Sequence, residues 1–149
     1  MKYDRDRVRK LLFEVAIGEE DIADEMYSKL NKAERTYYHQ LATAFFTEAL
    51  ASNFRKNESL EAVQGFAAQL SADKRNIDPK VPQKDIEELL RAMMGHEDLF
   101  GRLSPDDQFH VQIIAIQKIV AESKRFQSKI EKHLYEAELI VAEWASESM

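Results

Sequence analysis

Residues 106–149 of the chain read DDQFHVQIIAIQKIVAESKRFQSKIEKHLYEAELIVAEWASESM, a stretch that contains neither glycine nor proline. Residues 19–64 also lack both residue types. Glycine interrupts helices through its backbone entropy, and proline does so through a missing N–H and a ring clash. Because these two long stretches contain no helix breaker, the sequence predicts an all-α protein.

Apolar side chains recur along the C-terminal stretch at alternating steps of four and three residues, which is a heptad-like pattern. The seam consists of Phe109, Ile113, Ile116, Val120, Ser123, Gln127, Ile130, Leu134, Ala137, Val141 and Trp144. Its two polar members, Ser123 and Gln127, stand in the middle. One straight helix would span about 66 Å at 1.5 Å per residue, longer than the roughly 40 Å diameter of a compact domain of this size. We therefore expect a bend or break within residues 121–128, where Ser128 and Glu131 have capping-box spacing.

The remainder of the chain shows further segments with helical periodicity. The expected helices cover residues 3–17, 19–29, 32–56, 58–72, 83–94 and 105–122, followed by the C-terminal helix. Asn31 and Glu34 have the spacing of a capping box at the start of the third helix. Asn57 is the expected N-cap of the fourth.

Residues 73–82 read DKRNIDPKVP and predict the connector between the fourth and fifth helices, because each proline pushes the preceding residue out of helical geometry. A chain of 149 residues can bury one sizeable core. We predict a single domain over residues 1–149, a bundle of six or seven helices. The helices at 32–56 and 105–122 are expected at its centre.

Composition excludes several classes of protein. The chain has no cysteine, which removes disulfides, thiolate metal sites and cysteine nucleophiles. No apolar run approaches the roughly 20 residues that a membrane span requires. The first residues lack the apolar region of a secretory signal, so we expect a cytoplasmic protein without a membrane partner.

The charge distribution is uneven at the N-terminus. Residues 1–10 carry a net charge of +3, whereas residues 11–28 carry six acidic side chains and no basic one. We interpret this as attraction between two neighbouring helices. The alternative is a DNA-binding regulator that uses Arg5, Arg7 and Arg9 with a degenerate helix-turn-helix. The adjacent acids and the net charge of −6 argue against nucleic acid as a partner.

No catalytic signature, phosphate-binding glycine loop or H-E-x-x-H motif is present, and we expect no catalytic residue, cofactor or metal ion. Asp107 with His110 is interpreted as an acidic helix start followed by a histidine one turn later. His133, with Glu136 and Lys129 nearby, is interpreted as a solvated side-chain network. The loop group at residues 96–98, His-Glu-Asp, offers too few ligands for a hard cation.

A ligand pocket between helices is a further alternative. Tyr37, Tyr38 and His39, with Glu48 on the same helix, form the richest polar and aromatic group in the expected central helix. Such residues can line a small-molecule cavity. Tyrosines at these positions are more often core residues with their hydroxyls at the surface, and we favour that interpretation.

The function predicted from the sequence is that of a non-enzymatic protein–protein interaction module. The C-terminal helix has one apolar face and carries the only tryptophan, a residue type enriched at interface hot spots. The predicted docking strip consists of Ile130, Leu134, Ala137, Val141 and Trp144. The expected partner is another protein, including a second copy of the chain in a homodimer. DNA binding and small-molecule binding remain the two alternatives.

Overall fold

The computed structural model describes residues 4–55, 57–77, 80–95 and 103–147, and every regular element in these ranges is a helix. The elements are α1 (Arg5–Ala16), α2 (Glu20–Ser28), α3 (Lys32–Phe54), α4 (Leu60–Ala72), α5 (Gln83–Met93), α6 (Pro105–Glu122), α7 (Lys124–Ser128) and α8 (Ile130–Glu147). The all-α prediction is confirmed. The described residues contain eight helices rather than six or seven, because α7 is a separate five-residue helix between α6 and α8. In this part of the chain, no helix has both the length and the apolar character needed to cross a membrane.

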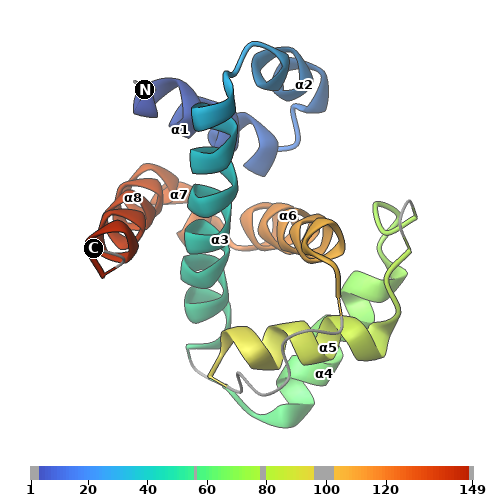
Figure 1. Ribbon diagram of the computed structural model, residues 1–149. Helices are drawn as coiled ribbons and strands as arrows, with labels where there is room; N and C mark the ends of the chain where they lie inside the picture. The colour runs from blue at the N-terminus through green and yellow to red at the C-terminus, as the bar shows by residue number, and fades with distance from the viewer. Residues whose placement is uncertain (1–3, 56, 78–79, 96–102, 148–149) are drawn as a thin grey trace.

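Helix α3 lies at the centre of the molecule, with α6 on one side and α8 on the other (Figure 1). Helices α1 and α2 pack at one end of α3, and the α4–α5 pair lies at the other end. Eleven residues of α3 are buried, compared with eight in α6. The buried hydrophobic side chains form one connected core to which all eight of these helices contribute.

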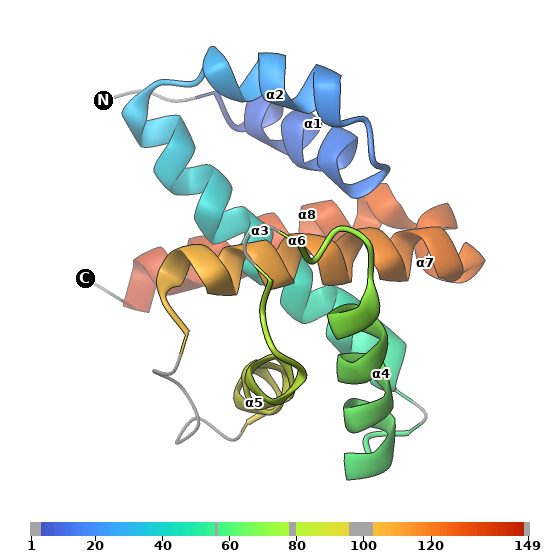
Figure 2. The same ribbon diagram turned by 90° about the vertical axis from the view of Figure 1, so that its right-hand side faces the viewer.

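The C-terminal stretch is broken where the sequence predicts a break. Helix α6 ends at Glu122, and Ser123 adopts extended backbone geometry with its Oγ accepting a hydrogen bond from the Phe126 N–H at 3.1 Å. Helix α7 joins α6 to α8, which runs back along the opposite side of α3 from α6 (Figures 1 and 2). The predicted cap at Ser128 is not formed, since its hydroxyl donates to the Arg125 carbonyl within the last turn of α7.

Residues 73–82, of which 78 and 79 lie outside the described ranges, join the end of α4 to the start of α5. Asn76, which is 1 % exposed, links the two ends of this segment through its side chain. The Asn76 side-chain amide donates to the carbonyls of Ser71 and Val81 at 3.1 and 2.9 Å, and its oxygen accepts from the Val81 N–H at 2.9 Å. Buried backbone groups of an irregular segment are thereby satisfied.

The other two predicted caps differ in outcome. The capping box of Asn31 and Glu34 is confirmed, with both reciprocal hydrogen bonds present. Glu34 also accepts the Asp4 N–H at 3.0 Å, so one buried carboxylate joins the starts of α1 and α3. Helix α4 instead begins at Leu60 and is capped by Ser59, because the Asn57 side chain is occupied by accepting the Ser59 N–H.

Candidate metal centre

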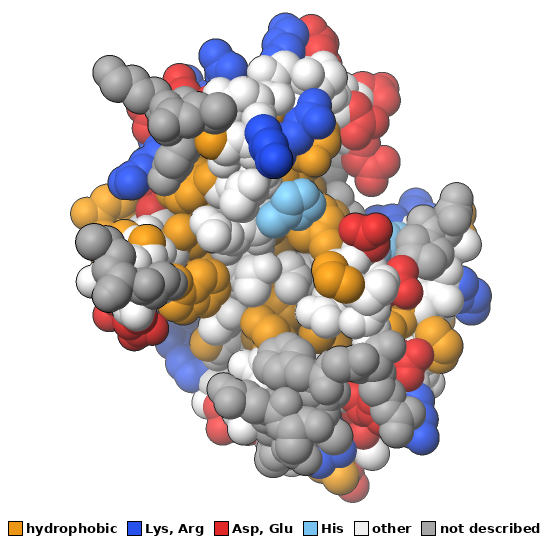
Figure 3. All heavy atoms as spheres, in the orientation of Figure 1, with side chains coloured by type: hydrophobic (Ala, Val, Ile, Leu, Met, Phe, Trp, Pro, Cys, Tyr) orange, Lys and Arg blue, Asp and Glu red, His pale blue; other side chains and the backbone are white. Residues whose placement is uncertain are grey.

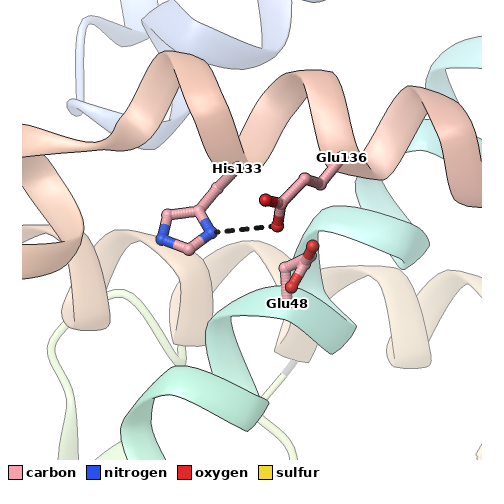
Figure 4. A group of neighbouring side chains, drawn as sticks. All are labelled: Glu48, His133 and Glu136. Carbon is pink, nitrogen blue, oxygen red and sulfur yellow. Dashed lines mark ion pairs between the residues drawn. The ribbon is translucent and has the colours of Figure 1, made fainter.

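Three side chains that can coordinate a metal converge between α3 and α8 (Figure 4). Glu48 comes from α3, and His133 and Glu136 stand one turn apart on α8. One nitrogen or oxygen atom from each lies within 4.8 Å of the corresponding atoms of the other two. His133 Nδ1 lies 3.9 Å from Glu136 Oε2. Within the described ranges, no other group of three or more histidine, aspartate or glutamate side chains meets this distance limit.

The packing of α8 on α3 places these groups. Leu134 and Ala137 are fully buried in the core and hold α8 against its neighbour. His133 and Glu136 each directly precede one of these buried residues. Since consecutive helical residues are about 100° apart around the axis, both side chains fall at the edge of the interface, half-buried and facing Glu48.

The His133 ring is held in place by an aromatic neighbour. It stacks on Phe126, with 4.3 Å between ring centroids and 11° between ring planes. Burial lowers the pKa of His133, and the nearby charge of Glu136 opposes that shift. His133 Nδ1 is buried and has no hydrogen-bond partner. The ring is therefore neutral at pH 7, with a fixed orientation toward the two carboxylates.

The pKa of Glu48 is shifted in the opposite direction from that of His133. Burial, a hydrogen bond shared with Glu136 and the charge of Glu136 together raise the pKa of Glu48 to about 7, against the opposing effect of Lys132. Two carboxylates this close disfavour double ionisation. The pair therefore favours a bound proton or cation at neutral pH.

An open groove of about 350 Å³ lies beside the three groups. Glu48 and His133 form part of its lining, together with Ser52. The groove is also lined by four basic side chains: Arg55, Arg125, Lys129 and Lys132. The site is thus accessible from solvent and combines two carboxylates, an imidazole and a group of cations.

The predicted docking strip is largely covered by the chain itself. Four of its members, Ile130, Leu134, Ala137 and Val141, are at most 7 % exposed because α8 folds back onto α3. Only Trp144, at 38 %, keeps substantial exposure. The apolar face that the sequence assigns to a partner is therefore satisfied within the same chain.

The residues predicted to line one ligand pocket lie in different places. Tyr37 and Tyr38 are buried in the core. His39 lines a separate pocket of about 320 Å³ against α6, where its ring makes an edge contact with Phe109 at 4.5 Å. Glu48, further along α3, belongs to the site with His133. The structure thus does not bring these four side chains together.

The three N-terminal arginines are engaged by neighbouring side chains. Arg9 contacts Glu138 of α8 at 2.8 Å and Asp6 at 2.6 Å. Arg7 lies 3.6 Å from Glu34 of α3, and the Arg5 guanidinium lies 5.9 Å from the centroid of the Tyr37 ring. The acidic side chains of α2, which gather at one edge of the face in Figure 3, do not take part in these contacts. These contacts of Arg5, Arg7 and Arg9 hold α1 against α3 and α8.

The sequence does not reveal this site, because its three members belong to different local patterns. His133 and Glu136 were visible as a pair one turn apart, and each flanks a seam residue, which is a signal for placement at an interface edge. Glu48 interrupts the apolar pairs of α3, another usable signal. No local pattern joins the two helices. The loop group at residues 96–98 lies outside the described residues.

No protein-family model, curated protein or solved structure matches this chain. The properties of the site therefore have to follow from its own geometry and charge.

Proposed function

We propose that this protein binds a divalent transition-metal ion between α3 and α8, with Glu48, His133 and Glu136 as its protein ligands. The supporting observation is the convergence of three ligand atoms, from two helices, within 4.8 Å of one another. An imidazole with two carboxylates is a donor set used for zinc, manganese and iron. This proposal replaces the expectation from sequence that no metal is bound.

The distances support a site that tightens when an ion enters. Ligand atoms around a tetrahedral ion with bonds of about 2.1 Å lie roughly 3.4 Å apart. Rotation of the two glutamate side chains can supply this adjustment, because both carboxylates are only half-buried. His133 Nδ1 needs no such adjustment in orientation, since the stack on Phe126 already directs it toward the carboxylates.

One cation competes for the same ligands. Lys132 Nζ lies 3.9 Å from Glu136 Oε1, but its side chain is 66 % exposed. Exposed ion pairs of this kind contribute about 0–1 kcal/mol. A divalent ion held by three ligands outcompetes such a pair, and three protein ligands leave a coordination position for water or a further ligand.

The experiment uses the full chain after treatment with a chelator. Saturating Zn²⁺ should raise the midpoint of thermal unfolding by roughly 5–10 °C, because an ion that binds only the folded state stabilises it by about 2.7 kcal/mol at a hundredfold excess over Kd. Co²⁺ should give a d–d absorption band that reports a nitrogen and oxygen donor set. Calorimetry should give one site per chain.

The Glu48→Gln variant should show two opposite effects. Without metal it should be more stable than the wild type by on the order of 1 kcal/mol, allowing for solvent screening, because the repulsion between Glu48 and Glu136 is removed. With Zn²⁺ it should lose the rise in unfolding midpoint. Glu131→Gln, an exposed position on the same helix, is the matched control: it should cost at most about 0.5 kcal/mol, because it removes an acid from the first turn of α8, and it should keep the full zinc shift. An equal zinc shift in wild type and Glu48→Gln would exclude this site.

A role in binding another protein stays a prediction, and the fold changes what is expected of self-association. Because the apolar face of α8 is covered by its own chain, the folded protein does not need a second copy. Multi-angle light scattering at high concentration should therefore give the monomer mass of 17.3 kDa. A dimer mass would restore the homodimer predicted from the sequence.

A further inference from the structure

The groove beside the metal ligands gathers positive charge in an otherwise acidic chain. The net charge of the protein is −6, yet four basic side chains line this one groove of about 350 Å³. They come from the end of α3 (Arg55), from α7 (Arg125) and from the start of α8 (Lys129 and Lys132). Of these, Lys132 has an ion-pair partner in Glu136, at 3.9 Å. Arg55, Arg125 and Lys129 are exposed and form no ion pair within the described part of the chain.

Helix dipoles do not explain the arrangement as a whole. Arg55 follows the carboxyl end of α3, where the helix dipole stabilises a cation. Lys132 instead stands in the first turn of the 18-residue helix α8, where a cation is disfavoured. Because all four basic side chains line one groove, an anion that enters it is attracted by each of them.

A bound metal ion would strengthen the attraction of the groove for an anion. In the metal-bound state the charges of Glu48 and Glu136 are neutralised by the ion. The four basic side chains then have no compensating negative charge in the groove. Glu48 and His133 line this groove, so a further ligand of the ion could reach it from the same space. An anion with several oxygens can bind the ion with one of them and accept hydrogen bonds from arginine with the others.

We propose that the groove binds a tetrahedral oxyanion, the phosphate group or its analogue sulfate, with one oxygen on the metal and the others held by Arg55, Arg125 and Lys129. This inference rests on the metal site proposed above. Metal and anion bind cooperatively, because each neutralises the charge that opposes the other. By linkage, the factor by which the anion raises metal affinity equals the factor by which the metal raises anion affinity.

The test measures Zn²⁺ affinity with a zinc-responsive indicator dye, in a chloride buffer of constant ionic strength, with and without sulfate. Sulfate is chosen because its zinc salt stays in solution. The expected result is a gain of about tenfold in Zn²⁺ affinity, within the usual range of coupling between sites. Glycerol 3-phosphate forms a second arm. A larger gain with it than with sulfate assigns the groove to the phosphate group of a larger molecule, and an equal gain assigns it to the free anion.

Charge-neutral variants separate the groove from the ligands. Arg125→Gln should keep zinc binding but lose most of the gain from sulfate. Lys124→Gln removes a neighbouring exposed cation that does not line the groove, and it should keep the full gain. Zinc affinity that is unchanged by either anion would overturn this inference and leave the metal site in place. Absence of zinc binding under all conditions would overturn both.

Discussion

Replacing Asn76 with aspartate should lower the free energy of unfolding by about 3–5 kcal/mol at neutral pH, the loss expected when a buried charge is left uncompensated. Asn76 is almost fully buried and donates from its amide nitrogen to two backbone carbonyls. Aspartate has nearly the same shape but no donor when ionised, so a carboxylate oxygen would face the carbonyls of Ser71 and Val81. Urea unfolding measures the change.

The control for this prediction is Asn57→Asp. The Asn57 side chain is exposed and acts only as an acceptor, from the Ser59 N–H at 3.0 Å, which a carboxylate can replace. This variant should stay within about 0.5 kcal/mol of the wild type. Acidification should also reduce the defect in Asn76→Asp, because a protonated carboxyl can donate to one of the carbonyls. A loss below 1 kcal/mol at neutral pH would contradict the role assigned to Asn76.

Truncating Phe126 to alanine should cost about 3–5 kcal/mol, the usual loss for a fully buried phenylalanine. Phe126 is 0 % exposed, lies 5.6 Å from the ring of Phe45 and stacks on His133. The substitution removes packing at the break between α6 and α8. It also releases the His133 ring, so metal affinity should fall by about tenfold, the lower end of the range for groups that orient a ligand. Urea unfolding and zinc titration measure the two effects.

Phe126→Leu separates the two consequences of the truncation. Leucine fills more of the volume and should recover a substantial part of the lost stability. It provides no flat ring to stack on the imidazole, so metal affinity should remain reduced. Wild-type zinc affinity in Phe126→Leu would show that the stack on His133 does not orient the metal ligand.

Local signals in the sequence account for most of the architecture. The absence of glycine and proline, the residue spacing of Asn31 and Glu34, and the two prolines in residues 73–82 each act within a few residues along the chain. Such short-range effects determine where helices begin and end. The length argument for residues 106–149 was also sufficient, because one unbroken helix could not pack against a core of this size.

The same break explains where the sequence pattern misleads. A continuous heptad places Ser123 and Gln127 in the seam, but the extended backbone at Ser123 resets the helical phase. In the structure Phe126 points into the core and Gln127 is exposed. The capping-box spacing of Ser128 and Glu131 predicts the cap five residues too late, since Ser123 is the residue whose Oγ accepts the Phe126 N–H.

The candidate site could not be predicted for a different reason. Its members lie on α3 and α8, and their approach depends on α8 folding back across the molecule (Figure 2). Periodicity identifies which face of each helix is apolar, but it contains no information on which residues meet across the contact. The docking strip depends on the same missing information, because an apolar face has the same pattern whether its own chain or a partner covers it.

The carboxylate of Glu34 has a consequence for local opening of the fold. It accepts the N–H groups of Asp4 and Asn31, so the first turn of α1 and the first turn of α3 share one acceptor. If the amino-terminal helix detaches, the central helix loses part of the contact network at its own first turn. Transient opening at this end of the molecule is therefore a cooperative event rather than the independent fraying common at chain termini.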